Sequence, residues 1–166
     1  MICDFMFKLQ SGLIVNGLSI RSEKAVRMLL LDMKRKYGVG WASASTVVIS
    51  RLRPSVLLRV RTKAGISHRV PYLLRGLQAD SYAVRWFRAG IKRRDERNFF
   101  ERVRLEWLSL DSVGQLRQRT VNVGYSGRNR DLVHSTALLN RGMISLFWGR
   151  RKLVLCKLFC DVGAIE

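Results

Sequence analysis

Basic side chains gather in three stretches of this chain, and they are the residues whose type and spacing could do chemistry. In chain order they are Arg59, Arg61, Lys63 and Arg69; Lys92, Arg93, Arg94 and Arg97; and Arg117, Arg119, Arg128 and Arg130. An arginine guanidinium is a planar fork that binds phosphate through two hydrogen bonds and stacks on bases. Any one of these stretches is also typical of a solvated surface. Three of them with little acidic balance favour contact with the phosphates of a nucleic acid.

The charge of the whole chain points the same way. Its 166 residues include 31 Lys and Arg against 12 Asp and Glu, a formal net charge of +19, and 23 of the basic residues are Arg. A compact body with this charge repels itself until a polyanion neutralises it. The hydrophobic fraction of 48% and the charged fraction of 26% are ordinary for globular proteins, which excludes a disordered tail, a collagen-like fibre and a coiled coil. The composition therefore predicts one folded domain with a stable nucleic-acid partner.

Signatures of enzymes, metal sites and membrane segments are missing from the sequence. It has no Gly-rich phosphate loop, no nucleophile elbow and no His-Glu-x-x-His. Cys3, Cys156 and Cys160 lack zinc-site spacing, and only His68 and His134 could complete a site, so we expect reduced thiols in an intracellular space. No apolar run approaches the ~18 residues needed to span a bilayer, and the first ten residues do not resemble a transit peptide. We expect no enzyme, no cofactor, no metal and no membrane partner.

Helical periodicity dominates the elements that must position the basic residues. Apolar residues recur at helical spacing in the segments 22–37, 42–53, 81–93, 98–110 and 131–148. We expect Ser22 and Asp131 to cap the first and last of these helices. Gly38 should end the first helix and Pro54 should stop the second. The sequence predicts an all-α fold, a single compact helical domain of about five to six helices.

Three of these helices carry apolar stripes that we expect to be buried. The stripes are Val26, Leu29, Leu30, Met33 and Tyr37; Phe100, Val103, Trp107 and Leu110; and Leu132, Thr136, Leu139, Met143 and Leu146. Trp86 and Trp148 also lie on apolar stripes, which favours a core role over stacking on single-stranded RNA. His134 lies early in the last helix, where we expect a half-buried side chain with a backbone partner. Arginines scattered on a helical body suit folded RNA, which is recognised by shape, backbone and 2′-hydroxyls.

One segment breaks the helical period. Residues 56–70 alternate with a period of two around a short loop, Lys63-Ala64-Gly65, which predicts a β-hairpin. A lone hairpin is marginally stable, so we expect a protruding basic arm that becomes ordered on a partner. Residues 111–130 are rich in Gly and Arg and predict a flexible basic loop.

Five motifs follow one another between residues 8 and 148. They are Asn16-Gly17 with Ser22-Glu23-Lys24-Ala25; Arg53-Pro54, Leu57-Leu58-Arg59-Val60, Gly65 and Val70-Pro71; Ala83-Val84-Arg85-Trp86; Glu101-Arg102 with Glu106-Trp107-Leu108; and Arg130, His134, Asn140-Arg141 and Trp148. In this order they resemble the motifs of the small-subunit ribosomal protein seven family. Leu18-Ser19 stands where that family has a basic pair, and Ser145-Leu146-Phe147 where it has His-aromatic-Arg. These departures resemble a divergent mitochondrial member more than a bacterial or plastid one.

The resemblance implies a structural constituent of the small ribosomal subunit. Such a protein would bind early in assembly and organise the 3′ major domain of the rRNA, which forms the subunit head, near the exit site for tRNA and mRNA. Its partners would be the rRNA, neighbouring head proteins and, near the hairpin, the exit-site tRNA and mRNA. Its place would be a ribosome, in mitochondria or else in a bacterial cytoplasm or plastid. The competing hypothesis is a DNA-compacting protein outside the ribosome, which would be equally small and basic.

The RNA contacts are expected from basic side chains spread along the chain. They are Arg21, Lys24, Arg59, Arg61, Lys63, Arg69, Arg75, Lys92, Arg93, Arg94, Arg97, Arg117, Arg119, Arg128, Arg130, His134, Arg141, Arg150 and Arg151. Residues 1–152 should form the helical domain with its arm at 56–70. Residues 153–166 form a tail with more apolar surface than a free tail usually exposes. We expect the tail to dock on a protein peculiar to its own ribosome, or else to fold back on the helices.

Overall fold

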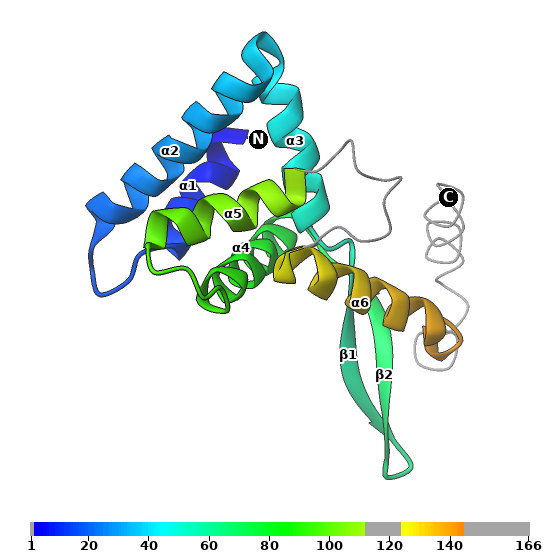
Figure 1. Cartoon of the computed structure of the whole chain (residues 1–166). Helices are drawn as coiled ribbons and strands as arrows, with labels where there is room; N and C mark the ends of the chain where they lie inside the picture. The colour runs from blue at the N-terminus through cyan, green and yellow to red at the C-terminus, as the bar shows by residue number, and fades with distance from the viewer. Residues whose placement is uncertain (1, 112–123, 145–166) are drawn as a thin grey trace. The chain divides into compact units, whose positions relative to one another are not determined.

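Helices and one β-hairpin follow one another in residues 2–111 and 124–144, the part of the chain that the structure, a computed structural model, describes (Figure 1). The elements are α1 (Ile2–Gly12), α2 (Ser19–Tyr37), a 3-10 turn η1 (Gly38–Gly40), α3 (Trp41–Leu52), β1 (Val56–Lys63), β2 (Ile66–Leu73), α4 (Gly76–Lys92), α5 (Phe99–Asp111) and α6 (Tyr125–Leu139). The mainly helical fold with a hairpin is therefore confirmed.

The chain divides into two compact units. One contains α1 to α5 and the start of α6, up to Arg130. The other contains the hairpin and the described residues from Asp131 to Ile144.

The core of the helical unit is built from one face of each helix from α1 to α5. Its fully buried side chains include Phe5, Leu9, Leu29, Val48, Leu52, Phe87, Val103 and Trp107. The rings of Phe87 and Trp107 meet edge to face, with centroids 5.9 Å apart, a favoured geometry for aromatic pairs. The stripes predicted within 22–37 and 98–110 lie in or against this core, which confirms both.

Helix α1 is an element that the sequence patterns did not reveal. It supplies Phe5 and Leu9 to the core, and Leu13, directly after the helix, continues the interval of four residues. At its end, a Cβ on Gly12 would overlap the γ-methyl of Val84 on α4. Glycine therefore allows α1 and α4 to pack closely at this point.

The ends of α2 and α3 test the predicted stop and start signals. Gly38 follows α2 with φ +55°, and its N–H donates to the carbonyl of Lys34, as expected of a glycine C-cap. Arg53 is extended before Pro54, so α3 ends where predicted. The prediction that Ser22 caps α2 is wrong, because α2 begins at Ser19 and the buried Ser22 hydroxyl donates to the Ser19 carbonyl at 2.7 Å.

Helix α6 begins at Tyr125, so Asp131 lies inside the helix and is not its cap. The start of α6 is held by Glu106 of α5, whose side chain is buried. Its Oε1 accepts hydrogen bonds from the Ser126 N–H at 3.0 Å and from the Ser126 hydroxyl at 2.6 Å. A carboxylate from another helix thus satisfies an N-terminal N–H group of α6. The predicted loop is therefore wrong for residues 125–130, while residues 112–123 lie outside the described residues.

The apolar stripe predicted on α6 is also wrong. Leu132 is 64% exposed and Leu139 is 86% exposed, whereas Ala137 is fully buried. The buried face of α6 is formed by small residues, so the large apolar side chains do not mark it. Helix α4 likewise begins five residues before the predicted 81–93 segment. Leu146 and Trp148 lie outside the described residues.

The hairpin pairs β1 with β2 from Val56 opposite Leu73 to Lys63 opposite Ile66. Its turn has only two residues, Ala64 (φ +52°) and Gly65 (φ +78°), the pattern of a type I′ turn, so Lys63 belongs to the strand and not to the predicted three-residue loop. Side chains at the base are buried, but both faces are exposed from residue 59 to residue 67. The period-two pattern therefore identifies a strand pair without a buried face at its tip.

Candidate nucleic-acid interface

Most of the basic residues of the hairpin share one face. Side chains alternate along a strand, so Arg59, Arg61 and Lys63 lie on the same side of β1. Residues opposite each other share a face, and Arg69 is opposite Val60, which puts it on the other side. All four side chains are exposed. The hairpin thus presents a row of three cations about 7 Å apart, with a fourth behind them.

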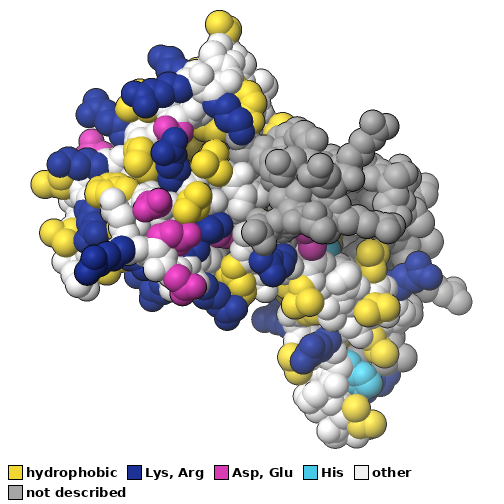
Figure 2. Space-filling view, in the orientation of Figure 1, with side chains coloured by type: hydrophobic (Ala, Val, Ile, Leu, Met, Phe, Trp, Pro, Cys, Tyr) yellow, Lys and Arg dark blue, Asp and Glu magenta, His cyan; other side chains and the backbone are white. Residues whose placement is uncertain are grey.

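In the helical unit, further predicted residues are exposed where helices begin and end. Arg21 and Lys24 lie in the first turns of α2 and Lys92 closes α4. Arg93 and Arg97 follow in the connection to α5, also exposed. Figure 2 shows basic side chains spread over this face of the unit, with fewer acidic ones among them. This distribution suits contacts with a phosphate backbone.

Two of these exposed cations lie over aromatic rings. The guanidinium carbon of Arg21 is 4.9 Å from the centroid of Phe99, and that of Arg93 is 3.9 Å from the centroid of Tyr125. Such cation–π contacts fix the side chain but leave the outer face of the guanidinium able to bind an anion.

Three predicted residues make contacts within the protein. Arg94 Nε is 2.9 Å from Glu106 Oε2, and the same guanidinium lies 3.7 Å from Glu96. Arg130 donates to the carbonyl of Ser50 at 3.4 Å. His134 is half-buried and its Nε2 accepts the Ser55 N–H at 3.3 Å, which confirms the expected backbone partner. These three side chains hold the protein's own structure.

The remaining predicted residues fall into two groups. Arg75, Arg128 and Arg141 are exposed, the first between β2 and α4, the second on α6 and the third just after it. Arg117, Arg119, Arg150 and Arg151 lie outside the described residues, as does the tail 153–166.

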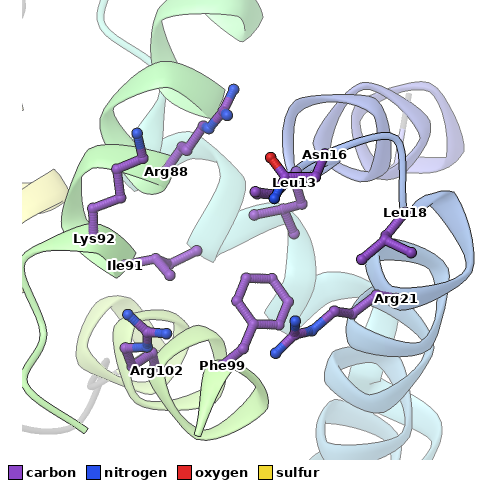
Figure 3. Close-up of a pocket in the computed structure, with 10 residues that line it drawn as sticks. Leu13, Asn16, Leu18, Arg21, Arg88, Ile91, Lys92, Phe99 and Arg102 are labelled. Atoms are coloured by element: carbon purple, nitrogen blue, oxygen red, sulfur yellow. The ribbon is translucent and has the colours of Figure 1, made fainter. Parts of the chain in front are cut away.

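Sequence reasoning missed a pocket of about 250 Å³ in the helical unit (Figure 3). Its basic lining includes the predicted Arg21 and Lys92, and also Arg88 and Arg102, which no motif singled out for binding. Arg88 and Lys92 are four residues apart on α4, so they share a helix face, and that spacing was the signal available in the sequence.

Neither a membrane span nor a metal cluster is found among residues 2–111 and 124–144. No helix there is long and apolar enough to cross a bilayer, and no group of three or more His, Cys, Asp or Glu side chains is arranged to hold a metal ion.

Comparison with known proteins gives a consistent set of relatives, although no family model matches the chain. The chain is 24% identical over 145 residues to small ribosomal subunit protein uS7 of Photobacterium profundum, which covers 87% of each chain. It is 25% identical over 145 residues to uS7 of Vibrio atlanticus, again 87% of each. For uS7 of Nitrosomonas eutropha the identity is 25% over 134 residues, 81% of this chain and 80% of that one.

These relatives agree with the family that the motifs resemble. The matched stretch covers most of the chain in each case, so the similarity is not confined to one basic segment. The low identity agrees with the departures at Leu18-Ser19 and Ser145-Leu146-Phe147. The chain is similar, over most of its length, to small ribosomal subunit protein uS7 of these bacteria, which agrees with the resemblance of its motifs.

Proposed function

We propose that this chain is a structural protein of the small ribosomal subunit that binds the 3′ major domain of the rRNA and organises it into the subunit head. The observation that carries the proposal is the set of exposed cations on several separate elements of a chain similar to uS7. Folded RNA brings phosphates from several strands to one protein surface, so cations on separate elements can each hold a different strand.

The two units supply different kinds of contact in this proposal. The hairpin offers a narrow row of cations on an element that is exposed on both faces at its tip. An element of this shape can enter between RNA segments, near the exit-site tRNA and mRNA. The helical unit offers a broad surface around Arg21, Lys24 and Lys92 for the body of the domain. Neighbouring head proteins would complete the set of partners.

The test is sedimentation of the tagged chain from a lysate, followed by sequencing of the bound RNA. We expect co-sedimentation with small subunits after DNase treatment and enrichment of the 3′ domain of the rRNA. Loss from the subunit fraction after DNase would support a DNA-compacting protein and overturn the proposal. The purified chain gives a second readout. If about 6–10 phosphates are contacted, its affinity for a 3′-domain rRNA fragment should fall roughly 10³–10⁵-fold between 50 and 200 mM salt.

The proposed place of this ribosome is the mitochondrion. The departures from the family's motifs support this choice, while the relatives named above are bacterial. Fractionation of cells that carry the tagged chain should place it with mitochondrial small subunits. Recovery with the ribosomes of a bacterial cytoplasm or of plastids would overturn the choice of organelle and leave the ribosomal role standing.

A further inference from the structure

The pocket of Figure 3 combines an apolar lining and a basic lining. It lies between the end of α1, the start of α2, the end of α4 and the start of α5. Its apolar part includes Leu13, Ile91 and Phe99, and the Phe99 ring lies in the middle of the labelled side chains. Its basic part is Arg21, Arg88, Lys92 and Arg102, and none of the lining residues is acidic. The cavity therefore favours an occupant that is flat and apolar on one side and anionic on another.

Two of the basic side chains lack an acceptor. The Nε atoms of Arg88 and Arg102 are buried, and neither has a hydrogen-bond partner in the part of the chain that the structure describes. Neither guanidinium has an ion-pair partner among those residues. A buried N–H group without an acceptor is unfavourable, because it has lost water and gained nothing. An occupant with phosphate or carbonyl oxygens would supply acceptors once each guanidinium turned its donors toward the opening.

The aromatic side of the pocket is already arranged for stacking. The guanidinium of Arg21 lies over the Phe99 ring at 4.9 Å, and the two are held by different helices, α2 and α5. RNA-binding proteins stack unpaired bases on aromatic rings and on guanidinium planes. An inorganic phosphate alone would leave this apolar side unused, and an apolar protein side chain would leave the four cations unused.

We propose that the pocket receives a single unpaired nucleotide of the bound RNA. Its base would pack against Phe99 and Arg21, and its phosphate or base-edge oxygens would accept hydrogen bonds from Arg88 and Arg102. The proposal rests on the proposed rRNA binding. It adds a site that would recognise an unstacked base, in addition to the cations that contact the phosphate backbone.

The experiment compares full-length variants on a 3′-domain rRNA fragment. One variant is Phe99→Leu, which removes the ring but keeps an apolar side chain. The second is the double variant Arg88→Gln/Arg102→Gln. The matched control is Arg27→Gln/Arg35→Gln, which removes two exposed cations of α2 outside the pocket. Nucleotide-resolved chemical probing and filter binding at several salt concentrations are the two readouts.

Wild-type protein should protect at least one unpaired nucleotide, and both pocket variants should restore its reactivity while the control does not. Phe99→Leu should weaken binding roughly fivefold or more without changing the salt dependence, because stacking is not an ionic contact. The double arginine variant should also lower the slope of log affinity against log salt by about 1 to 2. Phe99→Tyr keeps the ring and should retain the protection, which separates stacking from a folding defect.

Each other outcome has its own meaning. If wild-type protein binds the fragment and the pocket variants protect the same nucleotides as the control, the pocket inference fails and the proposed function stands. If wild-type protein binds the fragment no better than duplex DNA of equal length, the proposed function fails. Retention of free AMP or inorganic phosphate by the wild type, lost in Phe99→Leu or in the arginine variant with rRNA protection unchanged, would assign the pocket to a small anion and overturn the inference. Loss of a head protein from Phe99→Leu subunits with unchanged rRNA protection would assign it to a protein contact instead.

Discussion

The helical unit and the hairpin use their basic residues differently. In the helical unit, several cations neutralise acids that are wholly or partly buried. The pairs are Lys8 and Arg53 with Asp80, Arg94 with Glu106, and Arg104 with Asp32. Residues 56–73 contain four Lys or Arg and no Asp or Glu at all. A single net charge of +19 therefore contains two populations, one that holds the fold together and one that is presented to a partner.

The effect of removing a cation therefore depends on where its side chain lies as well as on its charge. A cation beside a buried carboxylate cannot be removed without leaving that carboxylate uncompensated, which is costly in a low-dielectric interior. A cation on a strand that is exposed on both faces contributes little to folding. The comparison predicts that substitutions in the ion pairs of the helical unit change stability and that substitutions of the exposed hairpin cations change binding.

Replacement of the buried acid is expected to have the largest effect. Glu106→Ala leaves Arg94 without its principal partner and removes the acceptor of the Ser126 N–H. We expect a loss of about 3–5 kcal/mol in the free energy of unfolding, measured by chemical denaturation. Glu101→Ala on the same helix is the control, because Glu101 is exposed and should change stability by no more than about 1 kcal/mol. Equal losses of unfolding free energy in Glu106→Ala and Glu101→Ala would contradict the distinction between the buried and the exposed acid.

The close approach of α1 and α4 gives the next largest effect. Gly12→Ala places a methyl group where Val84 already lies, so we expect a loss of about 1–3 kcal/mol in the free energy of unfolding. The double variant Gly12→Ala/Val84→Ala should lose less than the sum of the two single variants, because the smaller side chain makes room. Strict additivity in the thermodynamic cycle would show that the two residues do not meet.

A substitution in the turn of the hairpin is expected to increase stability. Ala64 has φ +52°, a conformation that asparagine adopts more readily than alanine. Ala64→Asn should stabilise the hairpin by about 1 kcal/mol, seen as roughly fivefold slower hydrogen exchange of its paired amides. Gly65→Ala should act in the opposite direction, since Gly65 has φ +78°. Unchanged exchange in both variants would mean that the turn does not limit hairpin stability.

Removal of the three exposed cations on β1 should leave the free energy of unfolding nearly unchanged. Arg59→Ala/Arg61→Ala/Lys63→Ala is expected to alter the free energy of unfolding by about 0.5 kcal/mol or less. It should still weaken rRNA binding and lower the salt slope by about 2 to 3. The matched control is alanine at Lys34, Arg35 and Lys36, which removes the same charge but also the favourable cations of the last turn of α2. Unfolding of the hairpin variant would show that the strand belongs to a core.

Local patterns predicted some of these elements, whereas the start of α6 depends on a contact between residues far apart in sequence. Helices α2, α3 and α5 follow from apolar spacing and from Gly38 and Pro54, all of which act within a few residues. The start of α6 depends on Glu106, which is 20 residues away in sequence, so no local signal marks it. Helix α1 went unrecognised, although Phe5, Leu9 and Leu13 carry a helical spacing.

The residues of the candidate site were also predictable from the sequence only in part. The hairpin row was predictable because alternation along a strand fixes which side chains share a face. Arg94 and Arg130 could not be separated from the exposed cations by sequence, because their partners come from other elements. The backbone partner of His134 was expected from its place early in the last predicted helix. The pocket was missed because Arg21, Arg88 and Arg102 come from three different helices.

The hydrogen bonds between Glu106 and Ser126 have a consequence for the order in which the helices form. A helix that must nucleate alone is unfavourable in its first turn. The first turn of α6 gains its carboxylate acceptor only after α5 has formed and presented Glu106. We expect the transition state for folding to contain α5 packed against its neighbours while the start of α6 is still unformed. Synthesis from the N-terminus follows the same order, because α5 with the acceptor Glu106 is made before α6 with the donor Ser126.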